Sequence, residues 1–241
     1  MTSPDLAAVA ADLAPSGTLR ASINLGNPVL AHGTPDEPGG VTVDLARALG
    51  ERLGLPVELL CFDAARSSLE AMQDGRADLC FLAIDPARAE TVAFTAPYVL
   101  IEGVYVVPED SPLTRADQVD RAGVRVGVKQ GSAYDLHLTR ALEHAEVVRG
   151  AEGTTVYVEQ SLEVGAGIRQ PVSAFVTDRA GHRLLEPAFM QIEQAVGTTQ
   201  TRAAATVDHL RAYVEEQKAN GFVAESLARA GRPDTRVAPP A

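Results

Sequence analysis

The stretch GAGIRQPVSAF, residues 165–175, places an arginine where an apolar segment gives way to a helix-forming segment. The apolar residues before Arg169 predict a strand, and the Gln-Pro after it predicts the first turn of a helix. In α/β proteins, ligands bind at the carboxyl ends of such strands. A guanidinium offers a planar fork of donors to a carboxylate, so Arg169 predicts an anionic group on the ligand.

The elements that would position such side chains form a repeated pattern. In the first half, strands are predicted at residues 18–25, 55–62 and 77–84, with helices at 41–54 and 66–75 between them. The order strand–helix–strand–helix–strand predicts a parallel sheet with covering helices and right-handed connections.

The second half repeats this order after residue 122. Strands are predicted at 123–131, 145–150, 163–169 and 190–197, with helices from 132 to 144, from about 154, and after 169. The final segment, residues 203–231, predicts two helices separated at Asn220-Gly221. The tail, residues 232–241, is expected to fray.

Composition excludes several classes of partner. The formal net charge of −11 disfavours nucleic acid and anionic membrane surfaces, and no apolar stretch is long enough for a membrane span. Cys61 and Cys80 each lie within an apolar run, which predicts two buried thiols rather than a disulfide. The five histidines lack the spacing of metal ligands, so neither a metal nor a cofactor is expected.

The first seventeen residues lack the basic and continuous apolar regions of a signal peptide. Ser3-Pro4-Asp5 instead predicts a helix start, with Ser3 as the N-cap and Pro4 in the first turn. As the sequence stands, this predicts a cytoplasmic protein. The expectation changes to the periplasm if a signal peptide has been removed.

The local strings resemble the extracellular solute-binding proteins of family 3, the amino-acid-binding proteins of ABC importers. The resemblance rests on GTLRASINLGNP, GGVTVDLARALGERLG, GVRVGVKQGSAYD, KANGFVAESLARAG and, above all, DPARAETVAFTAPY. It implies the type II periplasmic-binding fold, in which two Rossmann-like α/β lobes are joined by two hinge strands and close on a small ligand. The implied lobes are residues 1–102 with 197–241, and residues 103–196.

In the first lobe, the resemblance implies that Arg88, one turn into the helix at Asp85-Pro86, binds the ligand carboxylate. The alternative is a surface arginine that pairs with Glu90. The family usually places Ser or Thr five residues before this arginine, but here the residue is Ala83, so one donor is missing. Asn24 is a further candidate for a polar contact with the ligand.

In the second lobe, KQGSAYD matches the family's Gly-Ser/Thr turn at a helix start. Gly131 would let the backbone approach the ligand, and Ser132 would offer its hydroxyl and N–H to an anion. Ser132 can also act as an N-cap, and the two roles are compatible. Tyr134 either reaches the ligand or packs in the core.

Amino-acid binders of the family carry an aspartate at the strand end where Arg169 stands, and it pairs with the ligand's ammonium. Asp178 is a second candidate for that position, but too few residues separate it from His182 for a helix. With an arginine there, the expected ligand is not a plain α-amino acid but an acid with anionic groups at both ends. Alternatively, Arg169 points away or pairs with an acid such as Glu102 or Glu163.

Three functions fit this pattern. The first is a non-enzymatic binding protein for a small anionic or zwitterionic solute, with an ABC permease as its partner if the protein is exported. The second is a dehydratase of the cyclohexadienyl type, for which Glu102 or Glu163 would be the general acid. The third is a ligand-sensing module. Because no catalytic motif is present, the sequence favours binding and predicts no catalytic residues.

Overall fold

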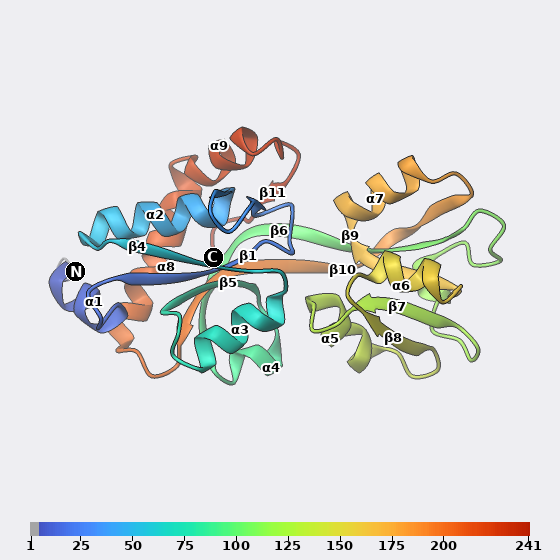
Figure 1. Ribbon diagram of the computed structural model, residues 1–241, viewed down its shortest axis with the longest axis horizontal. Helices are drawn as coiled ribbons and strands as arrows, with labels where there is room; N and C mark the ends of the chain where they lie inside the picture. Colours follow the sequence, from blue (N-terminus) through green and yellow to red (C-terminus); the bar gives the residue numbers. More distant parts are fainter. Residues whose placement is uncertain (1–4) are drawn as a thin grey trace. The chain divides into compact units, whose positions relative to one another are not determined.

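The computed structural model describes residues 5–241 and divides into two compact units (Figure 1). Unit 1 comprises the chain up to Leu100 together with Glu193–Ala241, and unit 2 comprises Ile101–Ile192. The chain passes between them in two long strands, β6 (Val92–Pro108) and β10 (His182–Thr199). The predicted helix start at Ser3 and Pro4 lies outside the described residues.

Unit 1 is built on strands in the order β4-β1-β5-β10. β1 is parallel to both β4 and β5, and β10 is antiparallel to β5. The first three strands are β1 (Leu19–Asn24), β4 (Val57–Phe62) and β5 (Leu79–Ala83). The helices are α1 (Leu6–Leu13), α2 (Val41–Leu53), α3 (Ala65–Gln73), α4 (Pro86–Ala89), α8 (Ala204–Ala219) and α9 (Phe222–Arg229). A small hairpin joins β2 (His32–Gly33) to β3 (Pro38–Gly39).

Unit 2 is built on strands in the order β6-β9-β7-β8. β7 (Arg125–Lys129) is parallel to β8 (Glu146–Gly150) and β9 (Val164–Ile168), and β9 is antiparallel to β6. Its helices are α5 (Ala133–Ala141), α6 (Gly153–Glu159), α7 (Arg169–Asp178) and the 3-10 turn η1 (Ala116–Gln118). The predicted strand–helix–strand–helix–strand order is therefore present in each unit.

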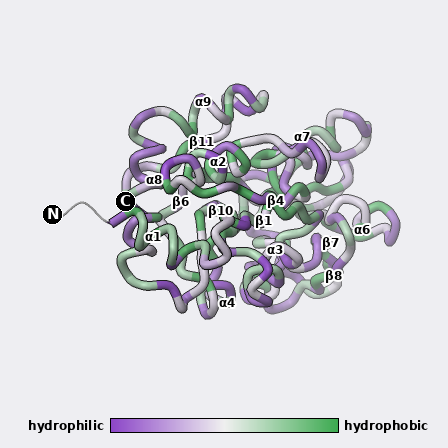
Figure 2. The backbone as a smooth tube through the Cα atoms, turned by 60° about the vertical axis from the view of Figure 1, so that its left-hand side comes forward, coloured by the Kyte–Doolittle hydropathy of each residue, from purple (hydrophilic) through white to green (hydrophobic). Residues whose placement is uncertain are grey.

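Local signals set the helix limits. α1 begins after Asp5, which is its N-cap and whose carboxylate accepts the amide of Ala7 at 3.1 Å. α2 ends at Gly54, which adopts the left-handed conformation at φ 66°. Gly221, at φ 86°, separates α8 from α9 as the sequence predicts. Hydrophilic and hydrophobic residues alternate along α2 and α9, as amphipathic helices require (Figure 2). Across residues 5–241, no helix is both long and apolar enough to span a bilayer.

The two thiols differ in burial. Cys80 is fully buried beneath α3, and this burial raises the pKa of its thiol to about 12. Cys61 is only partly buried, so the prediction of two buried thiols is wrong for this residue. Cys61 lies in β4, which has β1 as its only neighbour in the sheet order and therefore forms an edge of the sheet. Both cysteines are free thiols.

The C-terminal tail is ordered, which corrects the prediction that it frays. β11 (Arg236–Val237) pairs antiparallel with β6, opposite Leu100 and Val99. Ala238 N–H then donates to the carbonyl of Tyr98 at 3.0 Å, and the Ala238 side chain is buried. The tail has a docking site because the outer edge of β6 in unit 1 offers backbone groups that need partners. Nothing in residues 232–241 themselves indicates that edge.

Candidate functional site

In unit 1, the carboxyl end of β5 carries the predicted anion-binding residue. Asp85 caps the short helix α4 by accepting the amide of Ala87 at 2.9 Å, and Pro86 occupies the first helical position. The Arg88 side chain turns back toward β5, where its Nη1 donates to the carbonyl of Ala83 at 3.1 Å. Ala83 therefore positions the guanidinium through its backbone, although it lacks the hydroxyl usual in the family.

Arg88 is buried, with only 2% of its surface exposed. The alternative interpretation of Arg88 as a surface arginine is therefore wrong. Burial disfavours the charged guanidinium and lowers the pKa of Arg88, and the nearby negative charge of Asp85 opposes that effect. A second negative charge would further stabilise this cation in its low-dielectric surroundings.

Two asparagines after β1 support turns. Asn24 Oδ1 accepts the amide of Gly26 at 3.0 Å, and Asn27 Oδ1 accepts the amide of Val29 at 3.3 Å. Asn27 is buried, whereas Asn24 is half-buried. The side-chain oxygens of both residues therefore take part in local turn geometry of the kind asparagine commonly adopts.

In unit 2, Ser132 caps α5 within a tightly bonded turn. Its Oγ accepts the amide of Asp135 at 3.0 Å, and the Asp135 carboxylate accepts the amide of Gly131 at 2.8 Å. Gly131 has φ 70°, a conformation that favours glycine. The Ser132 N–H, which the sequence assigned to an anion, donates to the carbonyl of Lys129 at 3.1 Å.

Tyr134 lies in the first turn of α5 and is 5% exposed. Burial raises the pKa of its phenol, while hydrogen bonds with the Ser132 side chain and the Lys129 backbone oppose that rise. The phenol is thus part of the same turn as Ser132.

Arg169 is the first residue of α7, directly after β9, and it is ion-paired within unit 2. Its Nη1 and Nη2 donate to the two carboxylate oxygens of Glu186, at 2.6 and 2.9 Å, and its Nε donates to Glu102. These carboxylates raise the pKa of Arg169. The alternative that Arg169 pairs with Glu102 is what the structure contains, whereas Glu163 pairs with Arg125 at 2.9 Å.

The group at the end of β9 therefore carries one guanidinium and two carboxylates, a net charge of −1 when all three are ionised. The acids are its more accessible part: the Glu102 and Glu186 side chains are 50% and 59% exposed, against 29% for Arg169. Asp178, the other sequence candidate for this position, is the last residue of α7.

Sequence reasoning missed two carboxylates in these groups. Asp135 carried a usable signal, because Ser-x-x-acid at a helix start is the pattern of a capping box. Glu186 carried none, because its proximity to Arg169 depends on the pairing of strands that are remote in sequence.

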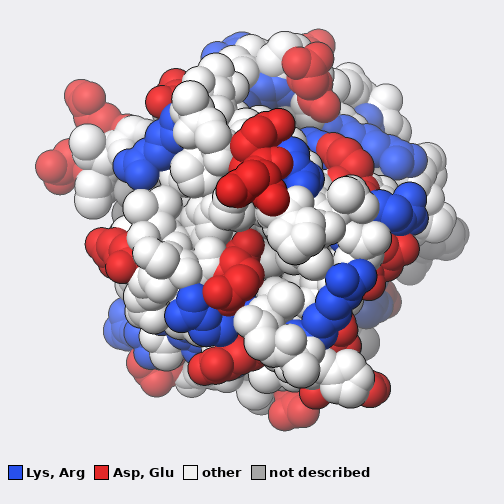
Figure 3. Space-filling view, turned by 90° about the vertical axis from the view of Figure 1, so that its right-hand side faces the viewer, with Lys and Arg blue, Asp and Glu red and all other residues white. Residues whose placement is uncertain are grey.

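Charges of both signs are dispersed over the face shown in Figure 3, where basic and acidic side chains lie side by side. Among residues 5–241, no group of three or more His, Cys, Asp or Glu residues is arranged to hold a metal ion.

The sequence matches the family model described as bacterial extracellular solute-binding proteins, family 3, over residues 22–231. The chain belongs to this family. The predicted class of solute-binding protein is thereby confirmed at the level of the family. The search of curated proteins finds no match.

Solved structures share the fold at low identity. A mutant of ArgBP from T. maritima is 17% identical with a TM-score of 0.75, and the alignment covers 92% of this chain and 99% of that one. AbpA from Streptococcus pneumoniae, bound to L-arginine, is 16% identical with a TM-score of 0.74, covering 93% and 98%. The ancestral amino acid-binding protein AncCDT-1, a precursor of cyclohexadienyl dehydratase, is 18% identical with a TM-score of 0.72, covering 90% and 97%. The predicted α/β fold of the type II periplasmic-binding architecture is confirmed.

Proposed function

We propose that this solute-binding protein holds a small solute through a carboxylate, and that Arg88 is the residue that binds it. The observation that carries the proposal is a guanidinium 2% exposed at the carboxyl end of β5, held by Ala83 beside the first turn of α4. Burial lowers the pKa of Arg88, so a solute carboxylate would stabilise the charged form. A bidentate pair would also fix the orientation of the solute.

Unit 2 supplies the turn at Gly131 and Ser132 as the second proposed contact. Asp135 fixes the geometry of this turn, because its carboxylate accepts the N–H of Gly131 and its own N–H donates to the hydroxyl oxygen of Ser132. The Ser132 hydroxyl is the proposed solute contact there. A rigid turn loses little conformational entropy on binding, which favours affinity.

The solute is proposed to need only one carboxylate. Both outer nitrogens of Arg169 are engaged by Glu186 and its Nε by Glu102, so a second solute carboxylate at Arg169 would have to displace one of these acids. If the solute is a dicarboxylate and not a plain α-amino acid, its second carboxylate must therefore displace Glu186 or Glu102 from Arg169. This requirement makes dicarboxylates and amino acids the two arms of the test.

The test is a thermal-shift screen followed by calorimetry on the full chain. One arm contains L-amino acids, including L-arginine, and the other contains C4–C6 dicarboxylates. A solute at 100 times its dissociation constant should stabilise the protein by about 2.7 kcal/mol. Arg88→Ala should abolish the shift from any stabilising compound. Arg66→Ala, which removes an exposed arginine of unit 1 paired with Glu70, should leave it intact.

The two arms of the screen distinguish a dicarboxylate solute from a solute that is held through one carboxylate. Stabilisation by dicarboxylates that is lost in Arg169→Ala would support the two-arginine version. Stabilisation by an amino acid that survives in Arg169→Ala would support the one-carboxylate version. Binding that Arg88→Ala leaves unchanged would refute the proposed anchor in both.

A dehydratase is the alternative activity, and its two sequence-based candidates for the general acid are both in ion pairs. The Arg125 guanidinium lowers the pKa of Glu163, whereas a general acid at neutral pH needs a raised pKa. Glu102 accepts from Arg169. These contacts favour binding without turnover, and incubation with prephenate or arogenate tests the point directly. Product formation would refute the non-enzymatic proposal.

The proposed partner is an ABC permease, and the proposed location is outside the cytoplasm, where family 3 proteins meet their solutes. Family membership supports both proposals. Fractionation of the producing cells is the direct check, since recovery in the cytosol would exclude delivery to such a permease.

A further inference from the structure

The C-terminal tail lies on the strand that first carries the chain from unit 1 into unit 2. β11 pairs with Leu100 and Val99 of β6, and Leu100 is the last residue of unit 1 before the passage to Ile101 (Figure 1). Ala238 extends the contact by donating to the carbonyl of Tyr98. Segments almost 140 residues apart in sequence are thus bonded directly beside the passage.

A lysine with a buried side chain also holds the tail in place through hydrogen bonds. Lys218, in the last turn of α8, donates through Nζ to the carbonyls of Pro97 at 3.2 Å and Pro239 at 2.8 Å. The same ammonium pairs with Glu215 at 2.5 Å, and the Lys218 side chain is only 4% exposed. One cation therefore joins the helix, the passing strand and the tail.

One edge of β6 changes its strand partner where the chain passes from unit 1 to unit 2. In unit 1 the edge is paired with β11 up to Leu100, and in unit 2 it is paired with β9 from Gly103 onward. Ile101 and Glu102 lie between these two ladders. Paired strand segments resist bending, because bending would break ladder hydrogen bonds. The other edge of β6 adjoins β10, so Ile101 and Glu102 lack a strand partner on one edge only, and that edge resists bending least at these two residues.

We propose that residues 235–239, fastened by Lys218, form a strap that restricts bending of β6 to Ile101 and Glu102. The strap supplies to the unit 1 segment of β6 the pairing that β9 supplies in unit 2. Hinges in two-unit proteins are a few residues that absorb changes in backbone angle, and the strap determines which residues these are. Lys218 is a positioning residue, because it acts on the passage through the backbone of β6.

The test is residue-resolved amide hydrogen exchange on the full chain and three variants. The variants are a deletion of residues 235–241, Lys218→Ala and Lys218→Arg. We expect the deletion to speed exchange at residues 98–102 at least tenfold, and to speed exchange in β10, which neighbours β6 in the sheet order, at least threefold. Lys218→Ala should give a smaller increase at the same positions, and Lys218→Arg, which keeps the cation, should restore protection.

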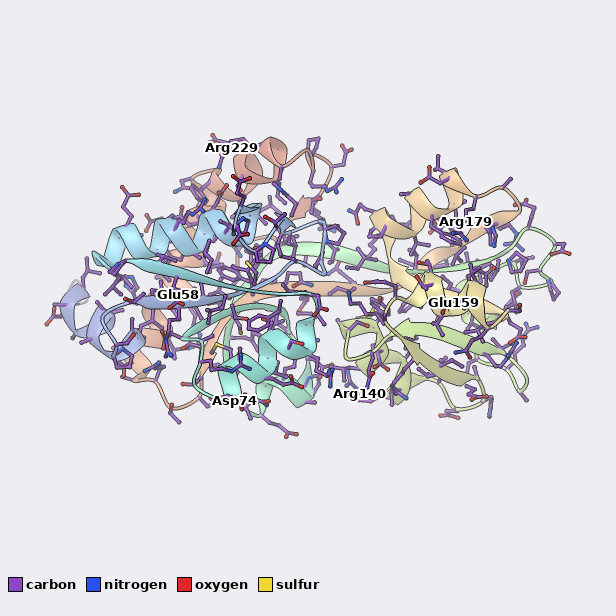
Figure 4. The ribbon with its side chains drawn as sticks, viewed as in Figure 1. Glu58, Asp74, Arg140, Glu159, Arg179 and Arg229 are labelled. Carbon is purple, nitrogen blue, oxygen red and sulfur yellow. The ribbon has the colours of Figure 1, made fainter. Side chains whose placement is uncertain are left out.

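Arg229→Ala is the matched control, because it removes a cation of α9 whose ion pair is with Asp44 of α2, at 2.9 Å (Figure 4). It should leave exchange at residues 98–102 unchanged. Faster exchange limited to residues 98–100 would overturn the proposal, since it would show only the loss of local bonds. Equal acceleration in β1 would also overturn it, because the tail would then stabilise unit 1 as a whole.

Discussion

Each unit contains the same arginine–carboxylate pair at the start of two adjacent parallel strands, in different surroundings. In unit 1, Arg20 of β1 faces Asp78, the residue before β5, and donates to it from its backbone N–H, Nε and Nη2 at 2.7–3.1 Å. In unit 2, Arg125 of β7 faces Glu163, the residue before β9, and donates from the same three groups at 2.9 Å. Each arginine also donates to a backbone carbonyl in the turn before its carboxylate, Arg20 to Gly75 and Arg125 to Ser161.

The two pairs differ in burial. The Asp78 side chain has no exposed surface and accepts a second guanidinium from Arg202 at 3.2 Å, whereas Glu163 is 39% exposed and has a single arginine. Water screens the second pair and competes for its donors. The same bonding pattern should therefore stabilise unit 1 through a buried network but contribute little in unit 2.

The opposite ends of the same strands show a second contrast. β5 leads to Arg88, a cation buried against backbone, and β9 leads to Arg169, a partly exposed cation between two acids. The repeated framework thus presents a positive group in unit 1 and a group of net charge −1 in unit 2. The charge of each strand end is set by neighbouring segments and not by the strand itself.

The largest expected effect is that of Asp78→Ala. The variant leaves Arg20 and Arg202 without the carboxylate they share, and breaking a buried ion pair costs about 3–5 kcal/mol. Equilibrium unfolding in urea measures the loss. Asp74→Ala is the control, because Asp74 is 63% exposed at the end of α3 and pairs with the exposed Arg76 at 3.3 Å (Figure 4). Equal losses in the two variants would contradict the role of burial.

The next largest effect is expected where α6 packs against the sheet of unit 2. A β-carbon at Gly153, at the start of α6, would overlap the carbonyl oxygen of Ala166. We expect Gly153→Ala to destabilise the protein by about 1–3 kcal/mol, because backbone atoms must move. Urea unfolding measures this loss as well. A loss under about 0.5 kcal/mol would show that α6 shifts freely.

The matched position in unit 1 has a polar contact instead of a glycine. Ser68 of α3 corresponds to Gly153 of α6, because each lies ten residues before the paired carboxylate of its unit. Ser22 of β1 donates to the carbonyl of Ser68 at 3.2 Å, and the two serine hydroxyls are also bonded to each other. Ser68→Ala removes one hydroxyl of this buried pair and should cost about 1 kcal/mol. A larger loss than that of Gly153→Ala would reverse the expected order of the two units.

The sequence predicted the repeated element order because hydrophobic periodicity and glycine stops are local properties. It also identified the start of α4 at Asp85-Pro86 and the cap at Ser132, where the cap residue and the helix are adjacent. The partners of Arg169 and the docking of the tail were outside its reach, since they depend on strand order and on edges left open by other segments. The burial difference between Asp78 and Glu163 is equally invisible, because both follow a turn and precede an apolar strand.

A further prediction concerns pH and is specific to unit 1. His209 of α8 is 5% exposed, and its Nε2 has no hydrogen-bond partner among the residues that the structure describes. Burial, together with the nearby charge of Arg52, lowers the pKa of His209 against a weaker opposing effect of Glu216. The unfolded chain therefore binds a proton more readily, so stability should fall as pH drops below about 6.5, the ordinary histidine value. The effect should be smaller than that of Gly153→Ala, because His209 is neutral at neutral pH.

Thermal unfolding between pH 7.5 and 5.5 measures this dependence in the full chain. His209→Gln should flatten the slope in that range, since it removes the titrating group while keeping a polar side chain. His144→Gln is the control, because it removes an exposed imidazole from unit 2 and keeps His209, so it should retain the part of the slope that His209 contributes. An unchanged slope in His209→Gln would contradict the prediction.

The smallest expected effect is that of Glu163→Gln, which completes the comparison with Asp78. Its pair with Arg125 is half-exposed, so the loss at pH 7 should be about 0–1 kcal/mol. Arg125 lowers the pKa of Glu163 in the folded state, so the stabilisation is present above the carboxyl's unfolded pKa and disappears as pH falls through the lower folded value. Urea unfolding at a series of pH values from 7 downward measures this dependence, and the variant and the parent chain should converge as pH falls through the folded pKa of Glu163. A loss at pH 7 as large as that of Asp78→Ala would mean that bonding geometry, and not burial, determines how much these matched pairs stabilise their units.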